Sequence, residues 1–242
     1  MRRRNLDDVN VLAVVVPALN EAATIAAVIE SCAPLGAVVI VVDDGSIDDT
    51  AHVARQSGAD VLRLPYNLGV GAAVRVGLLR ARSLGATEVL VMDADGQHDA
   101  AHASLLLEPV RAGRCDLAVG SRFAAGYRVG PARRFIMVRF ARLASRRLGT
   151  TITDATSGFR AFGAKALEVL PERYPTEYLS DTVETLLIAA ELGLRVEEVP
   201  VVMHVRQGGR PSNGAVASAY HLGRMVTVLL ASLLGLSGRR AP

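Results

Sequence analysis

The sequence predicts a single α/β domain built on a doubly wound, mostly parallel sheet flanked by helices. Two apolar runs, residues 11–16 and 38–42, contain β-branched and aliphatic side chains without a polar interruption. Such runs are typical of strands that a parallel sheet buries on both faces. Segments with helical spacing alternate with apolar runs of this kind as far as residue 120, and this alternation favours a doubly wound sheet.

The elements follow one another in a regular order. We expect strands at residues 11–16, 38–42, 60–64, 88–92 and 116–120, separated by helices at 20–32, 48–57, 71–84 and 101–112. Glu21 would lie in the first turn of the first helix, and Ser46 or Asp48 would cap the second. The alternation weakens after Arg122. There we expect a helix at 133–148, a helix at 180–192, an edge strand at 196–205 and a loop at 206–214.

Length and composition exclude several classes of protein. The chain has 242 residues, of which 50% are hydrophobic and 21% charged, so it is neither disordered nor fibrous. Cys32 and Cys115 have no metal-ligand spacing, which favours two buried thiols in a reducing compartment. Arg2–Arg4 are followed by polar residues where a signal peptide needs an apolar segment, so we expect a cytoplasmic protein.

The charge of the chain indicates which kinds of partner it could bind. All of the 27 basic residues except Lys165 are arginines, and the formal net charge is +3. A basic surface favours phosphates, acidic ligands or anionic lipid. Aromatic residues make up 4% of the chain and tryptophan is absent, so stacking platforms for nucleic acid are poorly supplied. We therefore expect no nucleic-acid partner.

Polar clusters stand at the predicted carboxyl ends of four strands, where open α/β sheets bind ligands. Asp93 and Asp95 could bind a hard divalent cation together with substrate phosphates, or they could form a solvated turn. Asp44 could accept hydrogen bonds from a nucleobase, whereas a plain turn with Ser46 as helix cap is the alternative. The glycine-rich residues 67–71 lack the Lys-Ser/Thr of a P-loop and do not indicate an ATPase.

Six motifs occur in an order that resembles family 2 glycosyltransferases, specifically their dolichyl- or polyprenyl-phosphate mannosyl- and glucosyltransferase branch. The resemblance covers roughly residues 9–213. The motifs are residues 16–21 (VPALNE), 42–46 (VDDGS), 67–71 (NLGVG), 92–98 (MDADGQH), 120–122 (GSR) and 156–160 (TSGFR).

This resemblance implies a GT-A fold, an inverting transfer of a hexose from a nucleotide sugar, and Mg²⁺ or Mn²⁺ as cofactor. It implies a nucleoside pocket formed by Pro17, Leu19, Glu21 and Asp44, and a metal–diphosphate site formed by Asp93, Ala94, Asp95 and Gln97. Phosphates would be contacted by Arg122, by Arg133 or Arg134, and by Arg206. Asp154 would act as a base or position the acceptor. Leu19 stands where the family often has an aromatic residue, so a GDP-, UDP- or dTDP-sugar remains open.

The order of elements and motifs predicts a domain plan. Residues 1–213 would form the transferase domain, with a donor half at about 9–122 and an acceptor half at about 123–213. Residues 214–242 would form a C-terminal helix whose apolar segment, 225–236, is too short to span a bilayer. This helix either packs on the core or lies on a membrane surface. The arginines of residues 133–147 form either a solvated helix face or a surface for anionic lipid or polyprenyl phosphate.

The acceptor determines the chemistry required. A phosphomonoester has a second pKa of about 6 and is already nucleophilic at neutral pH, so polyprenyl phosphate hardly needs a base. A saccharide or other hydroxyl acceptor needs one, and Asp154 is then the first candidate. We expect the polyprenyl-phosphate transferase, on the cytoplasmic side of the membrane and in peripheral contact with it. The alternatives are a transferase for hydroxyl acceptors and a non-catalytic module that binds nucleotide sugars.

Overall fold

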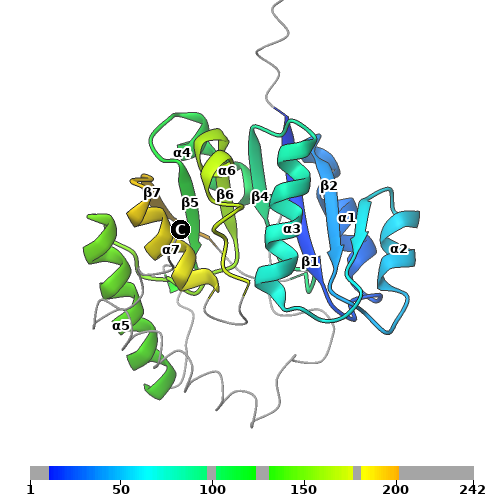
Figure 1. Cartoon of the computed structure of the whole chain (residues 1–242), viewed down its shortest axis with the longest axis horizontal. Coiled ribbons are helices and arrows are strands. Elements are labelled where there is room, and N and C mark those ends of the chain that lie inside the picture. The colour runs from blue at the N-terminus through cyan, green and yellow to red at the C-terminus, as the bar shows by residue number, and fades with distance from the viewer. Residues whose placement is uncertain (1–10, 97–101, 124–130, 177–180, 202–242) are drawn as a thin grey trace, which may run out of the picture.

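The computed structural model describes residues 11–96, 102–123, 131–176 and 181–201. Within these residues, seven strands form one sheet in the order β3-β2-β1-β4-β6-β5-β7 (Figure 1). The strands are β1 (Leu12–Ala18), β2 (Val38–Asp43), β3 (Asp60–Arg63), β4 (Glu88–Val91), β5 (Leu117–Ser121), β6 (Arg160–Gly163) and β7 (Val196–Pro200). Of these seven strands, β6 alone runs antiparallel to its neighbours, β4 and β5. The mostly parallel sheet is therefore confirmed, and β7 lies at its edge as expected.

Helices cover both faces of the sheet. They are α1 (Ile25–Ser31), α2 (Thr50–Gln56), α3 (Val70–Ser83), α4 (Ala103–Arg111), α5 (Pro131–Leu148), α6 (Ala164–Val169) and α7 (Asp181–Glu191), with a short 3-10 turn η2 (Ala33–Leu35). Of these helices, none combines the length and the apolar character that a membrane crossing requires.

The core consists of two apolar layers, one on each side of the sheet. Val14 and Val16 pack into the layer that also contains side chains of α1, α2 and α4. Val15, between them in β1, packs into the opposite layer with side chains of α3, α5, α6 and α7. Because successive side chains of a strand point to opposite faces, an uninterrupted valine run buries both. The doubly wound arrangement is confirmed.

Two local expectations were wrong at the start of the chain. The first helix begins at Ile25 and not at residue 20, so Glu21 precedes it. The reason is Asn20, whose φ of 56° is left-handed and cannot continue into a helix. Ser46 does not cap α2, because its hydroxyl accepts the backbone N–H of Asn20. The alternative, Asp48, accepts the N–H of Thr50 at the start of α2.

The second half contains two elements that the sequence pattern did not predict, β6 and α6. Strand β6 has four residues and begins with a charged one, Arg160, so it shows neither a long apolar run nor alternation. Several expectations lie outside the described residues: Gln97, Arg206, the side chain of Arg133, the end of the strand predicted at 196–205, the loop at 206–214 and the C-terminal helix at 214–242.

Candidate active site

The carboxyl ends of the adjacent parallel strands β2, β1 and β4 lie side by side at one end of the sheet. β1 pairs in parallel with both β2 and β4, and Ala18 at its end is in register with Asp43. The chain leaves β1 toward β2 on one side and returns later to β4 on the other, so the carboxyl end of β1 lies at a topological switch point. The polar clusters that follow these three strands therefore lie together, as the sequence predicted.

Direct hydrogen bonds join the loops after β1 and β2. The backbone N–H of Ile47 donates to the side-chain oxygen of Asn20 at 2.9 Å, and the N–H of Asn20 donates to Ser46 Oγ at 2.9 Å. The N–H of Glu21 donates to Thr50 Oγ1 at 2.8 Å. Side chains and backbone of the two loops are thus interlocked. This holds the Pro17–Glu21 segment, in which the resemblance to family 2 glycosyltransferases implies a nucleoside pocket, in one conformation.

Asp44 joins the loop after β2 to the loop before α3. Its carboxylate accepts the backbone N–H groups of Leu68 at 2.7 Å and Gly69 at 2.9 Å, and the residue is 4% exposed. Burial raises the pKa of Asp44 more than these two amides lower it. Each carboxylate oxygen has two lone pairs, so the geometry leaves acceptor capacity for a base. Recognition of the base by Asp44 stays a prediction.

Asp93 and Asp95 follow β4 in a turn. Asp95 is 9% exposed and Asp93 is half-buried. Gly158 faces the carboxylate of Asp93 so closely that a Cβ there would lie 3.3 Å from Asp93 Oδ1. This glycine belongs to the TSGFR motif, so the structure brings that motif to Asp93.

The donor set fits a divalent cation. Within the described residues no three His, Cys, Asp or Glu side chains gather into a metal cluster. Two carboxylates are nevertheless the usual protein share for Mg²⁺, which takes its other ligands from water and substrate phosphates. Glycine at position 158 avoids the Cβ that any other residue would place about 3.3 Å from Asp93 Oδ1. The role of Asp93 and Asp95 as ligands stays a prediction.

Arg122 and Asp154 form a buried ion pair. Arg122 Nε lies 2.6 Å from Asp154 Oδ2 and Arg122 Nη2 lies 2.8 Å from Oδ1. The side chain of Asp154 has no exposed area and that of Arg122 is 14% exposed. Burial alone would raise the pKa of Asp154, but the hydrogen bonds and charge of Arg122 hold it below its ordinary value. A carboxylate held this way is a weak base, and the arrangement favours the positioning role over the base role.

Glu198 on β7 supports this pair and was missed by sequence reasoning. Its carboxylate accepts the N–H of Thr153 at 2.5 Å, the hydroxyl of Thr153 at 2.6 Å and the N–H of Asp154 at 2.9 Å. It thereby fixes the backbone of Asp154, whose carboxylate in turn holds Arg122. The local signal in the sequence was only a second acid beside Glu197 in an expected edge strand.

Arg160, the last residue of the TSGFR motif, is 1% exposed. Its guanidinium donates to the backbone carbonyls of Ser157 at 2.9 Å and Thr182 at 2.6 Å. It thus connects the loop beside Asp93 to the first turn of α7. Burial lowers the pKa of Arg160, and nearby acidic groups, including Asp181 and Asp154, oppose that shift.

Asp181 begins α7 beside Arg160 and was also missed. It is 4% exposed, and burial raises its pKa to about 6 against the opposing charge of Arg160, with a smaller contribution from Asp93. The sequence placed an acid at the start of an expected helix, which is unremarkable by itself. Only the fold shows that this acid lies near Asp93.

The remaining predicted residues lie at the ends of β1 and β4, except Arg134, which lies on α5. Pro17 is buried within β1, Leu19 is half-buried after it, and Glu21 accepts the Thr24 hydroxyl at 3.0 Å. Ala94 is 3% exposed and packs in the core, so only its backbone could contact a ligand. Arg134 is exposed near the start of α5.

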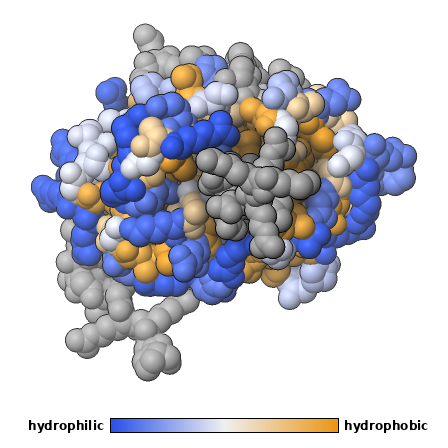
Figure 2. Space-filling view, turned by 90° about the horizontal axis from the view of Figure 1, so that it is seen from above, coloured by the Kyte–Doolittle hydropathy of each residue, from blue (hydrophilic) through white to orange (hydrophobic). Residues whose placement is uncertain are grey.

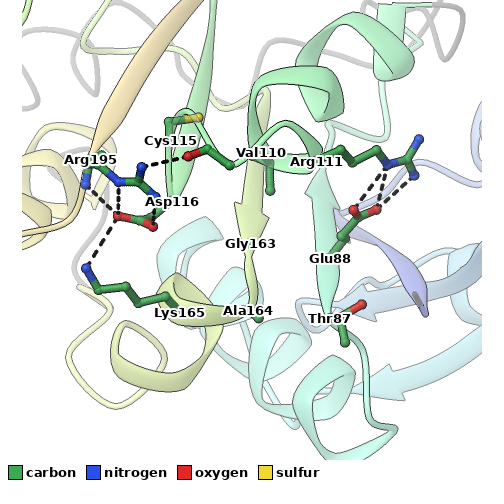
Figure 3. A pocket seen from close by; sticks show the side chains of 11 residues that line it. Thr87, Glu88, Val110, Arg111, Cys115, Asp116, Gly163, Ala164, Lys165 and Arg195 are labelled. Atoms are coloured by element: carbon green, nitrogen blue, oxygen red, sulfur yellow. Dashed lines mark hydrogen bonds and ion pairs between the residues drawn. The ribbon is translucent and has the colours of Figure 1, made fainter. Parts of the chain in front are cut away.

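A separate cavity of about 250 Å³ lies at the opposite end of the sheet (Figure 3). Its charged groups already pair with one another: Arg111 with Glu88 at 2.8 Å, and Arg195 with Asp116 at 2.9 Å. Burial raises the pKa of the Cys115 thiol there to about 11, so it is protonated at neutral pH. Figure 2 looks onto this end of the molecule and shows hydrophilic residues with smaller apolar areas between them. We assign this cavity no catalytic role.

Comparison with known proteins identifies the family. Residues 13–170 match the family model described as glycosyl transferase family 2. The chain belongs to glycosyltransferase family 2. This glycosyltransferase is 34% identical, over 71% of its length and 68% of the relative's, to polyprenol monophosphomannose synthase of Mycolicibacterium smegmatis. It is 31% identical to a dolichyl-phosphate hexose transferase of Haloferax volcanii, over 81% of its own length and 84% of the relative's.

Solved structures give the same fold. The glycosyltransferase superposes with a TM-score of 0.70 on glucosyl-3-phosphoglycerate synthase of Mycobacterium tuberculosis, at 27% identity, covering 96% of this chain and 81% of that one. That enzyme was crystallised with Mn²⁺, uridine diphosphate and glucosyl-3-phosphoglycerate. The expected GT-A fold and the expected membership of family 2 are both confirmed, and the protein is a glycosyltransferase.

Proposed function

We propose that this glycosyltransferase moves a hexose from a nucleotide sugar to a polyprenyl phosphate with the help of a divalent cation, at the cytoplasmic surface of a membrane. The observation that most favours a phosphate acceptor is the Arg122–Asp154 pair. Asp154, the base that the sequence suggested, is fully buried and bound by two guanidinium hydrogen bonds. A phosphate acceptor is ionised at neutral pH and reacts without such a base.

The chain's own residues would divide the work between binding and alignment. Glu198 and Asp154 hold Arg122 in a fixed orientation, and a guanidinium is well suited to phosphate oxygens. Asp44 and the loops after β1 and β2 form the nucleoside side of the site. Alignment of acceptor and donor in this way lowers the barrier without a covalent intermediate.

Asp93 and Asp95, with Gln97, would hold Mg²⁺ or Mn²⁺. When bound, the cation supplies positive charge that stabilises the departing nucleoside diphosphate. A structural neighbour crystallised with Mn²⁺ and uridine diphosphate supports this assignment. The names of the relatives, which include an undecaprenyl-phosphate mannosyltransferase of Micrococcus luteus at 32% identity, support the lipid acceptor.

A donor screen followed by product analysis tests the function. Thermal shift with GDP-, UDP- and dTDP-hexoses, each with Mg²⁺ or Mn²⁺, should identify the donor, because a ligand stabilises the folded state in proportion to its affinity. The donor found is then incubated with polyprenyl phosphate. A glycosyl phosphate product supports the proposal, and donor turnover that never labels the lipid contradicts it.

Asp95→Ala tests the metal assignment. We expect transfer to fall by at least about a thousandfold, because cation stabilisation of a leaving group contributes several kcal/mol. Urea unfolding of the variant should change little. Unchanged transfer by the variant, or unchanged transfer by the wild type after chelation, would contradict the metal role.

A second candidate is transfer to a hydroxyl group of a small phosphorylated acid. Two observations favour it: the likeness to glucosyl-3-phosphoglycerate synthase, and the Asp181 carboxyl near Asp93 with its raised pKa. A carboxyl with a pKa near neutrality suits proton abstraction from a hydroxyl. Incubation of the donor with 3-phosphoglycerate in place of the lipid separates the two functions by the mass of the product.

A further inference from the structure

Helix α5 presents a distinctive outer face. We define the α5 outer face as Phe135, Val138, Arg139, Arg142 and Arg146, which are spaced at three or four residues and so share one side of the helix. Phe135 is 60% exposed and Val138 is 38% exposed, and the three arginines are exposed as well. The opposite side of α5 is buried against the core. The helix therefore keeps two large apolar side chains in solvent although it has a separate, satisfied packing face.

Among the described residues, the positive charge of α5 has no carboxylate counterpart in an ion pair. Its eighteen residues include six arginines and no aspartate or glutamate. None of the ion pairs formed among the described residues includes an arginine of α5. The guanidinium of Arg139 lies instead over the ring of Phe135, 4.6 Å from its centre. The result is a positive surface with an aromatic group among its charges.

This combination matches the chemistry of an anionic lipid surface. Helices that lie in the interface of a bilayer join apolar side chains to arginines that contact lipid headgroups. Each basic residue near an anionic membrane adds an attraction that is lost with salt. Nucleic acid would also attract the charges, but it offers no apolar region for Phe135 and Val138.

We propose that the α5 outer face docks this glycosyltransferase onto the headgroup region of an anionic lipid bilayer. Figure 1 shows α5 at one side of the molecule beside α7, reaching past the carboxyl end of β5. Because α5 extends beyond the carboxyl end of β5, a membrane docked on its outer face would lie beside the end of the sheet that carries the site (Figure 1). The inference deepens the proposed function, since it supplies the surface by which the enzyme meets a lipid acceptor.

A single tryptophan tests the docking. The chain has no tryptophan, so Phe135→Trp provides one reporter on the α5 outer face. On vesicles containing phosphatidylglycerol we expect a blue shift of its emission and quenching by brominated lipid. On vesicles of phosphatidylcholine alone we expect neither. Leu105→Trp is the matched control, because Leu105 is 53% exposed on α4, on the opposite face of the sheet, and should show no shift.

Charge variants test which surface binds. Arg139→Ala with Arg142→Ala should weaken binding to phosphatidylglycerol vesicles by at least about tenfold. Arg55→Glu on α2 changes the net charge by the same amount and should bind like the wild type. In about 1 M NaCl, where the Debye length is about 3 Å, binding should be largely lost. Equal binding of the double variant, or tighter binding of duplex DNA than of these vesicles, would overturn the proposal.

The outcome can be separated from that of the proposed function. Vesicle binding is measured without donor or acceptor, so it stands if no transfer to lipid is found. Transfer to a water-soluble, short-chain polyprenyl phosphate should be the same in the double variant and the wild type. Transfer to the same phosphate in vesicles should fall in the double variant. Loss of both activities together would contradict a docking role for Arg139 and Arg142.

Discussion

Arginines are used in two different ways in two regions of this glycosyltransferase. In the body of the domain, Arg111, Arg122 and Arg195 pair with carboxylates of which at most 7% is exposed. On α5, the described arginines are exposed and take no part in the ion pairs formed among described residues. Arg111, Arg122 and Arg195 neutralise charges that the fold has buried. The exposed arginines of α5, which have no ion-pair partner among the described residues, leave a positive field that an external anion can neutralise.

Removal of a paired arginine should have the largest effect. Arg122→Ala leaves Asp154 buried without its counter-charge, which typically costs about 3 to 5 kcal/mol. We expect the free energy of unfolding in urea to fall by that order, together with loss of transfer. Arg122→Lys should recover part of the stability. A variant as stable as the wild type would show that the pair does not fix this part of the site.

The buried Asp181 carboxyl should reveal itself through pH. Its folded pKa, about 6, is above the ordinary value, so its contribution to stability is present below that ordinary value and is lost as the pH rises through about 6. Asp181→Asn does not ionise. Its stability relative to the wild type should therefore increase by about 1 to 3 kcal/mol between pH 4 and pH 7. Urea unfolding at the two pH values measures this, and a difference that shrinks with pH would contradict it.

Two neighbouring acids on β7 give a smaller, matched contrast. Glu198→Gln replaces an acceptor of three hydrogen bonds and should cost about 1 to 2 kcal/mol. Because Arg122 would lose its alignment, we expect kcat to fall more than KM rises. Glu197 pairs with Arg114 at the surface, so Glu197→Gln should cost less than about 1 kcal/mol. Equal kinetics for the two variants would remove Glu198 from the positioning of the site.

The smallest effect is expected on α5. Arg142→Ala removes an exposed side chain without an ion partner in the described structure, and should change the free energy of unfolding by no more than about 0.5 kcal/mol. Differential scanning calorimetry at low salt measures this. A clear loss of stability would mean that Arg142 belongs with the structural arginines of the body.

The sequence predicted one part of the site better than the other. Asp44, Asp93 and Asp95 follow long apolar strands, and parallel strands end at the same edge of a sheet, so their proximity followed from local patterns. Arg122 and Asp154 are 32 residues apart, and they meet only because of an antiparallel strand too short to be recognised. The raised pKa of Asp181 could not be predicted either, because it depends on burial and neighbours that no local pattern encodes.

Strand β6 has a mechanical consequence. It comes from the second half of the chain, yet it lies between β4 and β5, which both precede it, and its hydrogen bonds join the strands on either side. Residues 9–122, which resemble a donor-binding half, and the residues that follow them therefore share one continuous sheet. The two parts cannot move apart as rigid bodies without breaking the hydrogen bonds between β6 and its neighbours. We therefore expect any opening and closing during turnover to involve the loops at the carboxyl ends of the strands and not the sheet itself.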